Sequence, residues 1–353
     1  MDHPRDDRRF PDGKPRPPTI RDVARSANVS VGTVSKALNN NGSLRQETRE
    51  RVIAVANELG FRPNDLAQSL HRGHTLTVGL ITNDSFGRFT MPIMEGLEEC
   101  LTDNRIAVFL ANATDDPERE ARHIEQLIGK RVDGIVATAR RADRREPLQM
   151  PARGLPVIYV FSQVDDPDAR SLLPDDEGGA ILAVDHLARL GRKRIAHVTG
   201  PERFEAVRLR RDGYRKALAA AGLGEPDDHY LPGVWSEGWG REAVAHLFRA
   251  RKAAPDAIFC GNDQIARGVT DALRERGIGV PDSVAIVGFD NWDVMAEASR
   301  PPLTSVDMNL KHLGRQAGLQ LLDMIGGKHL SGVQRLPCTL VIRDSCGGRN
   351  GMA

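Results

Sequence analysis

From Leu76 onward, short apolar runs rich in valine and isoleucine alternate with segments that have the periodicity of helices. Strands that are apolar on both faces are typical of parallel sheets, because the helices that connect such strands cover both faces. The alternation therefore predicts βαβ units and an α/β fold. The expected strands are Leu76–Thr82, Ile106–Ala111, Val132–Thr138, Pro156–Phe161, Arg194–Thr199, Asp256–Cys260 and Val284–Gly288.

Three short helical patterns precede these strands. Thr19 and Asp22 have the spacing of a capping box, which satisfies free backbone amides at the start of a helix. Ser30 is a suitable N-cap for a second helix only a few residues later, and a third helical pattern ends at Gly60. Two short helices joined by so tight a turn are typical of a helix-turn-helix unit, which we assign to residues 19–63.

The outer face of the second helix predicts contact with DNA. Its side chains are small, polar or basic, as base edges and phosphates require, although the solvated face of an ordinary three-helix bundle looks similar. Residues 19–72 carry eight Lys/Arg against five Asp/Glu, whereas the whole chain has a net charge of only +1. Arg45, Arg49 and Arg51 could add phosphate contacts. The candidate DNA-binding residues of this unit are Thr19, Val31, Gly32, Thr33, Ser35, Lys36 and Asn39.

Residues 64–73 form a further short helical pattern that starts at Asn64 and ends at Gly73. A helix of about ten residues is too short to be stable alone in water. We therefore expect this segment to fold only against a partner and to act as a hinge between the two domains.

The run TIRDVARSANVSVGTVSKALN, followed by NDLAQSL, resembles the head and hinge of the LacI/GalR family of transcription regulators. The resemblance extends to about Ser345. It implies a homodimer whose recognition helices enter the major groove of a pseudo-palindromic operator, while paired hinge helices enter the minor groove. In the hinge it implies DNA contacts from Asn64, Ala67, Gln68 and Leu70, with Leu70 as an apolar wedge. Gly32 departs from the family pattern, in which a longer base-reading side chain is common.

For the rest of the chain the resemblance implies two doubly wound lobes of the periplasmic-binding-protein type, with a ligand in the cleft between them. We expect crossings between the lobes near Pro174, Thr304 and Leu336. One lobe would comprise about 74–174 plus 304–336, and the other 175–303 plus 337–345. Residues 1–18 are expected to be a disordered tail and 346–353 a flexible one.

Ligands of open parallel sheets bind beyond the carboxyl ends of the strands, so side chains that follow predicted strands are candidate ligand contacts. An arginine, carboxylates, amides and an aromatic plane suit a polar, hydroxylated molecule, and a sugar is the default effector. Phe204 and Ala206 stand where purine-binding members carry polar groups, which argues against a purine. As alternatives, Asp290 could cap the next helix, Asp263 is expected to cap its own, and Trp235 could belong to a core. The candidate effector-binding residues are Asp84, Phe89, Ser162, Arg210, Trp235, Asn262 and Asp290.

Several function classes lack the residues they need. The sequence has no nucleotide-binding glycine motif, no GxSxG turn and no spaced Cys/His set, so we expect neither an enzyme, nor a cofactor, nor a metal site. The four cysteines are expected to be free thiols. No apolar run is long enough to span a membrane, and the N-terminus lacks a secretory core, so we expect a cytoplasmic protein.

Of two alternative functions, the first is disfavoured on two counts and the second stays open. A periplasmic solute receptor would need a signal peptide and would not carry the N-terminal unit. A regulator controlled by a partner protein instead of a metabolite would have the same sequence features. The C-terminal residues lack an apolar heptad, which favours a dimer over a tetramer. Repression is the commoner outcome in the family, and the sequence specifies neither the operator, nor the effector, nor whether the effector induces or co-represses.

Overall fold

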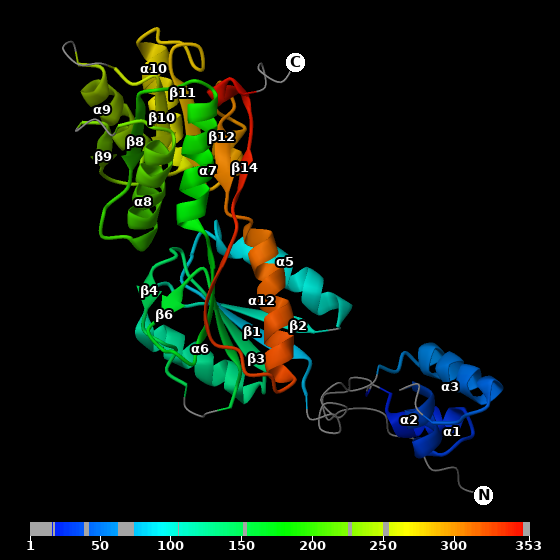
Figure 1. The fold of residues 1–353 in the computed structure, drawn as a ribbon. Helices are drawn as coiled ribbons and strands as arrows, with labels where there is room; N and C mark the ends of the chain where they lie inside the picture. The colour runs from blue at the N-terminus through cyan, green and yellow to red at the C-terminus, as the bar shows by residue number, and fades with distance from the viewer. Residues whose placement is uncertain are drawn as a thin grey trace, which may run out of the picture. The chain divides into compact units, whose positions relative to one another are not determined.

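The computed structural model describes residues 16, 18–38, 42–62, 74–104, 106–150, 154–224, 228–249 and 254–348. The chain divides into two compact units, Met1–Thr75 and Leu76–Ala353 (Figure 1). The predicted hinge at 64–73 lies outside the described residues, as does almost all of the tail at 1–18.

The first unit is a three-helix domain made of α1 (Ile20–Ser26), α2 (Val31–Leu38) and α3 (Gln46–Glu58). Its small core is formed by Val23, Val34 and Val52, whose side chains are fully buried. Two of the predicted local signals are present at the helix starts. The Asp22 carboxylate accepts hydrogen bonds from the Thr19 backbone N–H (2.8 Å) and hydroxyl (2.7 Å), and the Ser30 hydroxyl accepts one from the backbone N–H of Thr33 (3.1 Å). These caps fix where α1 and α2 begin.

The turn between α1 and α2 depends on one left-handed residue. Asn28 has a φ of 51°, a conformation that asparagine adopts more readily than most residues with a side chain. It reverses the chain within a few residues, so that α2 packs against both α1 and α3. The result is the helix-turn-helix arrangement predicted from the sequence.

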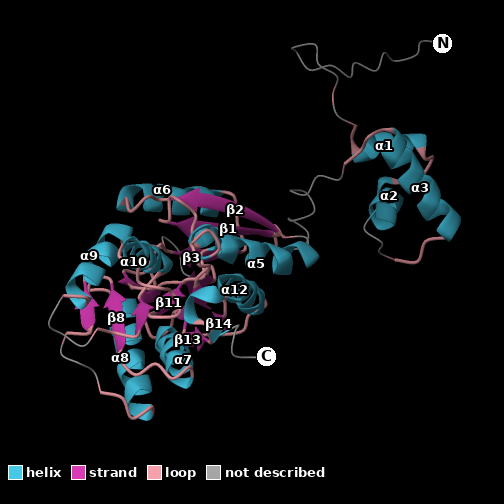
Figure 2. Cartoon of the chain, turned by 90° about the horizontal axis from the view of Figure 1, so that it is seen from above, coloured by secondary structure: helices cyan, strands magenta, loops and turns pink. Residues whose placement is uncertain are grey.

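The second unit contains two six-stranded sheets, each covered by helices on both faces (Figure 2). In the first lobe all neighbouring strands are parallel, in the order β13-β7-β5-β3-β1-β2. Helices α5 and α12 pack together on one face of this sheet, and α6 covers the other. The elements of this lobe are β1 (Thr77–Thr82), α5 (Thr90–Asp103), β2 (Ala107–Asn112), α6 (Pro117–Gly129), β3 (Gly134–Thr138), β5 (Val157–Val160), β7 (Arg170–Pro174), α12 (Leu310–Ile325) and β13 (Gly332–Leu336), with a small two-stranded ladder of β4 (Arg144–Arg145) and β6 (Gln163–Val164).

The second lobe has the strand order β14-β12-β11-β10-β8-β9. Its strands are parallel except β14, which runs antiparallel to β12 at the edge. Helix α7 packs against α8, and α9 packs against α10. The elements are α7 (Asp176–Arg189), β8 (Ile195–Thr199), α8 (Glu205–Ala220), β9 (Tyr230–Pro232), α9 (Glu237–Leu247), β10 (Ala257–Cys260), α10 (Asp263–Glu275), β11 (Ala285–Phe289), α11 (Asp293–Ala296), β12 (Thr304–Asp307), β14 (Thr339–Val341) and the short 3-10 helix η1 (Asp344–Cys346).

Two glycines allow α5 and α12 to pack in close contact. A Cβ atom at Gly96 would lie 1.8 Å from the backbone oxygen of Lys311, and one at Gly314 would lie 1.9 Å from that of Ile93. Any larger residue at either position would force the helices apart. Because α12 follows directly on the crossing from the second lobe, this contact also fixes where that crossing enters the first lobe.

The predicted α/β class and all seven expected strands are present, and two boundaries differ. β12 pairs with β11 and its Val306 is buried in the core, so the chain crosses back to the first lobe after Asp307 and not at Thr304. The prediction of a flexible tail from residue 346 is wrong as far as Gly348. The Cys346 thiol is buried, and its sulfur lies 3.0 Å from the Thr304 hydroxyl and 3.3 Å from the Gly348 backbone nitrogen, which holds this segment on the lobe.

All four cysteines are buried free thiols. Among the residues that the structure describes, no helix has the length and apolar character needed to cross a membrane.

Candidate functional site

Helix α2 presents the surface that the sequence predicted for DNA recognition. Val34 and Ala37 point into the three-helix core, and the other face is accessible. Val31, Gly32 and Lys36 are exposed, and Thr33 and Ser35 are half-buried. This division leaves the first turn of α2, which carries no acidic residue, open to solvent.

The remaining predicted DNA contacts divide into two groups. The Thr19 hydroxyl is bound to the Asp22 carboxylate, so in this structure it serves the start of α1. Asn39 and the four hinge residues Asn64, Ala67, Gln68 and Leu70 lie outside the described residues.

Between the two lobes lies a cavity of about 160 Å³. Five of the seven predicted effector residues line it: Phe89, Arg210, Trp235, Asn262 and Asp290. It is also lined by Arg88, Arg140, Arg141, Ala142, Asp143, Phe161, Phe204, Ala206 and Gln264. Asp84 and Ser162 are not among the lining residues.

Arg210, on α8, is held in place from behind by a buried carboxylate. Its Nε donates to Asp176 at 2.8 Å, its Nη1 donates to the Gly261 backbone oxygen, and its guanidinium lies 3.6 Å from the centre of the Phe289 ring. Burial raises the pKa of Asp176, and the charge of Arg210 opposes that rise. The guanidinium is therefore positioned rigidly, with Nη2 only 3.8 Å from Asp290.

Asp290 follows β11 in a left-handed conformation (φ 99°) and carries an ion pair between the lobes. Its carboxylate binds the guanidinium of Arg88, which belongs to the β1–α5 loop of the first lobe. Burial raises the pKa of Asp290, while Arg88 and Arg210 lower it. Asp290 does not cap the next helix, because the N-cap position of α11 is Trp292, which makes no side-chain cap.

The expectation that Asp263 caps α10 is wrong. Asn262 caps α10, since its Oδ1 accepts the backbone N–H of Ile265 at 2.9 Å. Asp263 accepts instead from the Ser305 hydroxyl (2.6 Å) and the Trp292 backbone N–H (2.7 Å), which ties α10 to β12 and to the loop after β11. Burial and the nearby Asp290 raise the pKa of Asp263 to about 7.

Trp235 lies against the backbone that follows β8. A Cβ atom at Gly200 would be 2.3 Å from the indole ring, so only glycine at this position allows the ring its place. The half-buried ring packs on the core of the second lobe and also lines the cavity. The two roles that the sequence left open for Trp235 are thus compatible.

Asp84 and Ser162 have local reasons for lying outside the cavity lining. The Asp84 carboxylate accepts the backbone N–H groups of Phe89 (2.8 Å) and Thr90 (3.0 Å) and so caps α5. Ser162 is fully buried, and its hydroxyl has no hydrogen-bond partner in the described part of the chain. The residue before it, Phe161, has a left-handed φ of 56° and lines the cavity in its place, stacked on Phe89 with 4.9 Å between ring centres.

Four charged residues that line the cavity, Arg88, Arg140, Arg141 and Asp143, were not among the predicted site residues. Arg140, Arg141 and Asp143 follow the predicted strand 132–138, and this strand end was not examined for ligands. Arg88 lies one residue from a predicted site residue. Only the packing of the two lobes brings these side chains to one cavity.

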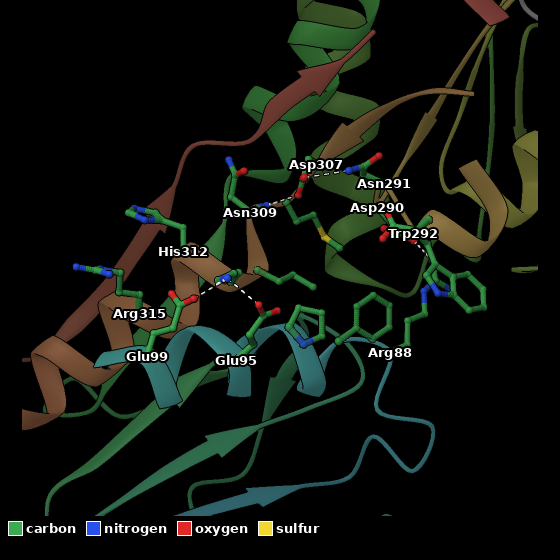
Figure 3. Close-up of a pocket in the computed structure, with 16 residues that line it drawn as sticks. Arg88, Glu95, Glu99, Asp290, Asn291, Trp292, Asp307, Asn309, His312 and Arg315 are labelled. Atoms are coloured by element: carbon green, nitrogen blue, oxygen red, sulfur yellow. Dashed lines mark hydrogen bonds and ion pairs between the residues drawn. The ribbon is translucent and has the colours of Figure 1, made fainter. Parts of the chain in front are cut away.

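A second, larger cavity of about 570 Å³ borders the first and is shown in Figure 3. Its walls come from α5, the start of α12, the loop after β11 and the end of β12. Lys311 lines this cavity and forms ion pairs with Glu95 and Glu99, each at 2.7 Å. Arg88, Phe89 and Asp290 line both cavities, so the interlobe ion pair separates them.

Comparison with known proteins identifies the family. A model of bacterial regulatory proteins of the lacI family matches residues 19–64, and a model of the periplasmic binding protein-like domain matches residues 184–346. Over 330 residues, 93% of this chain and 98% of the relative, the sequence is 32% identical to catabolite control protein A of Priestia megaterium. The chain belongs to the LacI family.

Other LacI-family proteins match over nearly the whole chain. The ribose operon repressor of Escherichia coli strain K12 is 32% identical over 92% of this chain and 98% of its own, and the transcriptional repressor CytR of the same strain is 30% identical over 93% and 96%. The lac repressor dimer solved with operator and the anti-inducer ONPF has a TM-score of 0.76 at 27% identity, covering 94% of this chain and 99% of that one. The complex of the regulator CelR with cellobiose has a TM-score of 0.64 at 29% identity, covering 93% and 99%.

The family resemblance predicted from the head and hinge motifs is thereby confirmed. This LacI-family chain is a DNA-binding transcription regulator and not an enzyme, because its relatives are regulators across both the N-terminal unit and the two lobes.

Proposed function

We propose that this regulator is a homodimeric repressor that binds operator DNA through α2 and is controlled by a polar, carbohydrate-like effector in the interlobe cavity. The cavity carries the effector part of the proposal. Arg210, Asn262, Asp290 and Trp235 supply charged, amide and aromatic groups from the second lobe, opposite Phe89 of the first. Such a set suits a hydroxylated molecule that can bond at its edge and stack on its face. A relative that represses the ribose operon and one solved with cellobiose support a sugar or sugar derivative.

The DNA-binding part of the proposal rests on the accessible face of α2. Lys36 would contact a phosphate, and Val31, Thr33 and Ser35 would lie against base edges, with Gly32 allowing close approach. The lac repressor solved as a dimer on its operator supports a dimer for this chain too. Residues 64–73 would act as the hinge, with Leu70 as a wedge in the minor groove. A DNA-binding regulator of this kind acts in the cytoplasm.

The effector would act by changing how the lobes close. The contacts that cross the cleft next to the cavity include the ion pair of Arg88 with Asp290, the hydrogen bond from the Glu205 backbone N–H to Asp143 at 2.8 Å, and the ion pairs of Arg144 and Arg335 with the Glu205 carboxylate. An effector that binds Asp290 competes with Arg88 and so shifts the balance between lobe arrangements. A coupling free energy of about 1–3 kcal/mol between effector and operator is enough for regulation.

The first test is selection of operator sequences from random DNA with the full-length protein at two salt concentrations. We expect a pseudo-palindrome whose affinity falls steeply with salt, since phosphate contacts release counterions. Leu70→Ala should then weaken binding to the selected DNA while leaving effector binding unchanged. Selection that enriches no sequence, with or without candidate sugars, would contradict the DNA-binding proposal.

A further inference from the structure

The interlobe cavity is more basic than recognition of a neutral sugar requires. Four arginines line it, Arg88, Arg140, Arg141 and Arg210, against the two carboxylates of Asp143 and Asp290. The neighbouring larger cavity has the opposite balance, with five carboxylates against Arg88, Lys311 and Arg315 (Figure 3). The two cavities therefore differ in charge. The smaller one, which is lined by four arginines, favours an anion.

The four arginines differ in how deeply they are buried and in how strongly they are paired with carboxylates of the protein. Arg88 and Arg210 are deeply placed, with 15% and 6% of their side chains exposed, and both are paired with buried carboxylates. Arg140 and Arg141 lie at the outer end, with 46% and 43% of their side chains exposed. The inner pair thus already has buried carboxylate partners, and the outer pair is the more accessible to an anionic group of a ligand.

The carboxylates that pair with Arg140 and Arg141 inside the protein would compete only weakly with an anionic ligand. Arg140 pairs with Asp115, which is itself 42% exposed, and an ion pair in such a setting contributes little. Among the described residues, the carboxylate paired with Arg141 is that of Asp143, whose oxygen lies 3.6 Å from the Arg141 Nε, too far for a hydrogen bond. Burial and the charge of Arg140 lower the pKa of Arg141, and the nearby Asp143 and Asp115 offset this lowering only in part.

The opposite wall adds two features that favour an anion. The Arg141 guanidinium of the first lobe and that of Arg203 in the second both lie over the ring of Phe204, at 4.8 and 4.5 Å. Phe204 precedes the 16-residue helix α8, and the first amide of that helix already binds a carboxylate from across the cleft, that of Asp143. Positive charge from both lobes therefore converges at this end of the cavity.

We propose that the effector is an anion, a carbohydrate-type molecule whose phosphate or carboxylate group binds the guanidinium groups of Arg140 and Arg141 at the outer end of the interlobe cavity. The planar, forked guanidinium matches both anionic groups, and two adjacent arginines hold such a group in a fixed orientation. The polar body of the molecule then lies against Trp235 and Asn262. This inference rests on the proposed function, because it takes the interlobe cavity to be the effector site.

The test measures anion binding by the full-length protein with inorganic phosphate as the first probe, in chloride buffer held at constant ionic strength. Calorimetric titration should show phosphate binding to the wild type. Arg141→Gln should weaken it by about tenfold to a hundredfold, the loss expected when one charge-assisted contact is removed. The matched control is Arg122→Gln, which removes the same charge from an exposed residue of α6 in the same lobe that does not line the cavity, and it should bind phosphate as the wild type does.

Glucose, glucose 6-phosphate and glucuronate then identify the anionic group. Tighter binding of the phosphate or of the carboxylate sugar than of glucose, with loss in Arg141→Gln, supports the inference and names the group. Absence of phosphate binding in the wild type, or equal affinity in Arg141→Gln, overturns it. If neutral glucose alone binds and shifts operator affinity, the proposed function stands and the anion inference falls. If operator selection fails while phosphate binding depends on Arg141, the anion inference stands and the proposed DNA function falls.

Discussion

Arg210 is expected to stabilise the second lobe as well as to contact the effector, and the two roles can be separated. Its guanidinium donates to Asp176 through Nε and lies 2.7 Å from the same carboxylate through Nη2, with 6% and 1% of the two side chains exposed. Replacing Arg210 with methionine leaves Asp176 buried without its partner. Breaking a buried ion pair from one side costs about 3–5 kcal/mol of unfolding free energy. Loss of effector response in that variant alone would therefore be ambiguous.

A double-mutant cycle resolves the ambiguity. Asp176→Leu should cost less than Arg210→Met, because Asp290 remains 3.8 Å from the Arg210 guanidinium as a second partner. The double variant removes both charges, and such replacements by apolar residues are often close to neutral. It should therefore be more stable than the sum of the single effects predicts, by about 2 kcal/mol. It should still fail to respond to effector if Arg210 contacts it.

Urea unfolding followed by tryptophan fluorescence measures this cycle, since all three tryptophans, Trp235, Trp239 and Trp292, belong to the second lobe. The penalty of Arg210→Met should grow as the pH rises from about 4 to 8. Burial keeps the folded-state pKa of Asp176 above its ordinary value, so the folded state resists the ionisation that the unfolded state undergoes. Strict additivity of the two single variants, or a penalty that does not change with pH, would refute this account of the pair.

Three further outcomes can be measured on the same protein. Asp263 has a folded-state pKa of about 7, so wild-type stability should fall as the pH rises from about 4 through 7, and Asp263→Asn should remove that part of the slope in urea unfolding at pH 5 and pH 8. Gly314→Ala should cost more than about 2 kcal/mol, because its Cβ would lie 1.9 Å from the Ile93 oxygen, whereas Gly129→Ala, with no atom within 4 Å, should be neutral or stabilising in thermal melts. Equal melting temperatures for the two glycine variants would disprove the close-packing argument. Lys36→Ala should weaken binding to the selected operator and reduce the slope of log affinity against log salt by about 1, and an unchanged slope would remove Lys36 from the phosphate contacts.

The two cavities suggest how the cleft is organised around one ion pair. Arg88 and Asp290 join the lobes, stand between the basic and the acidic cavity, and are packed by aromatic rings, since the Arg88 guanidinium lies 4.3 Å from the ring of Trp292. A ligand on the basic side that engages Asp290 therefore changes the environment of both cavities at once. Under the proposed function, this pair would link closure of the lobes to occupation of the cleft.

The sequence by itself determined the elements and their class. The capping residues Thr19, Asp22 and Ser30 act within one turn of chain, and the helix-turn-helix depends on spacings of a few residues. The strands could be predicted because an apolar run flanked by turn residues is a local pattern that a buried parallel strand requires. Such short-range signals also pointed to Phe89, Trp235, Asn262 and Asp290, which follow β1, β9, β10 and β11, whereas Arg210 lies inside α8, away from any strand end.

Only the tertiary structure decided what those side chains do. Arg210 is committed to Asp176, 34 residues earlier, and Asp290 to Arg88, 202 residues earlier. Asp84 and Asn262 cap helices, because a buried polar group binds the nearest free amide when folding brings one within reach. Arg140 and Arg141 line the cavity only because the first lobe packs against the second. Contacts between residues so distant in sequence follow from how the layers assemble, and no local pattern in the chain records that assembly.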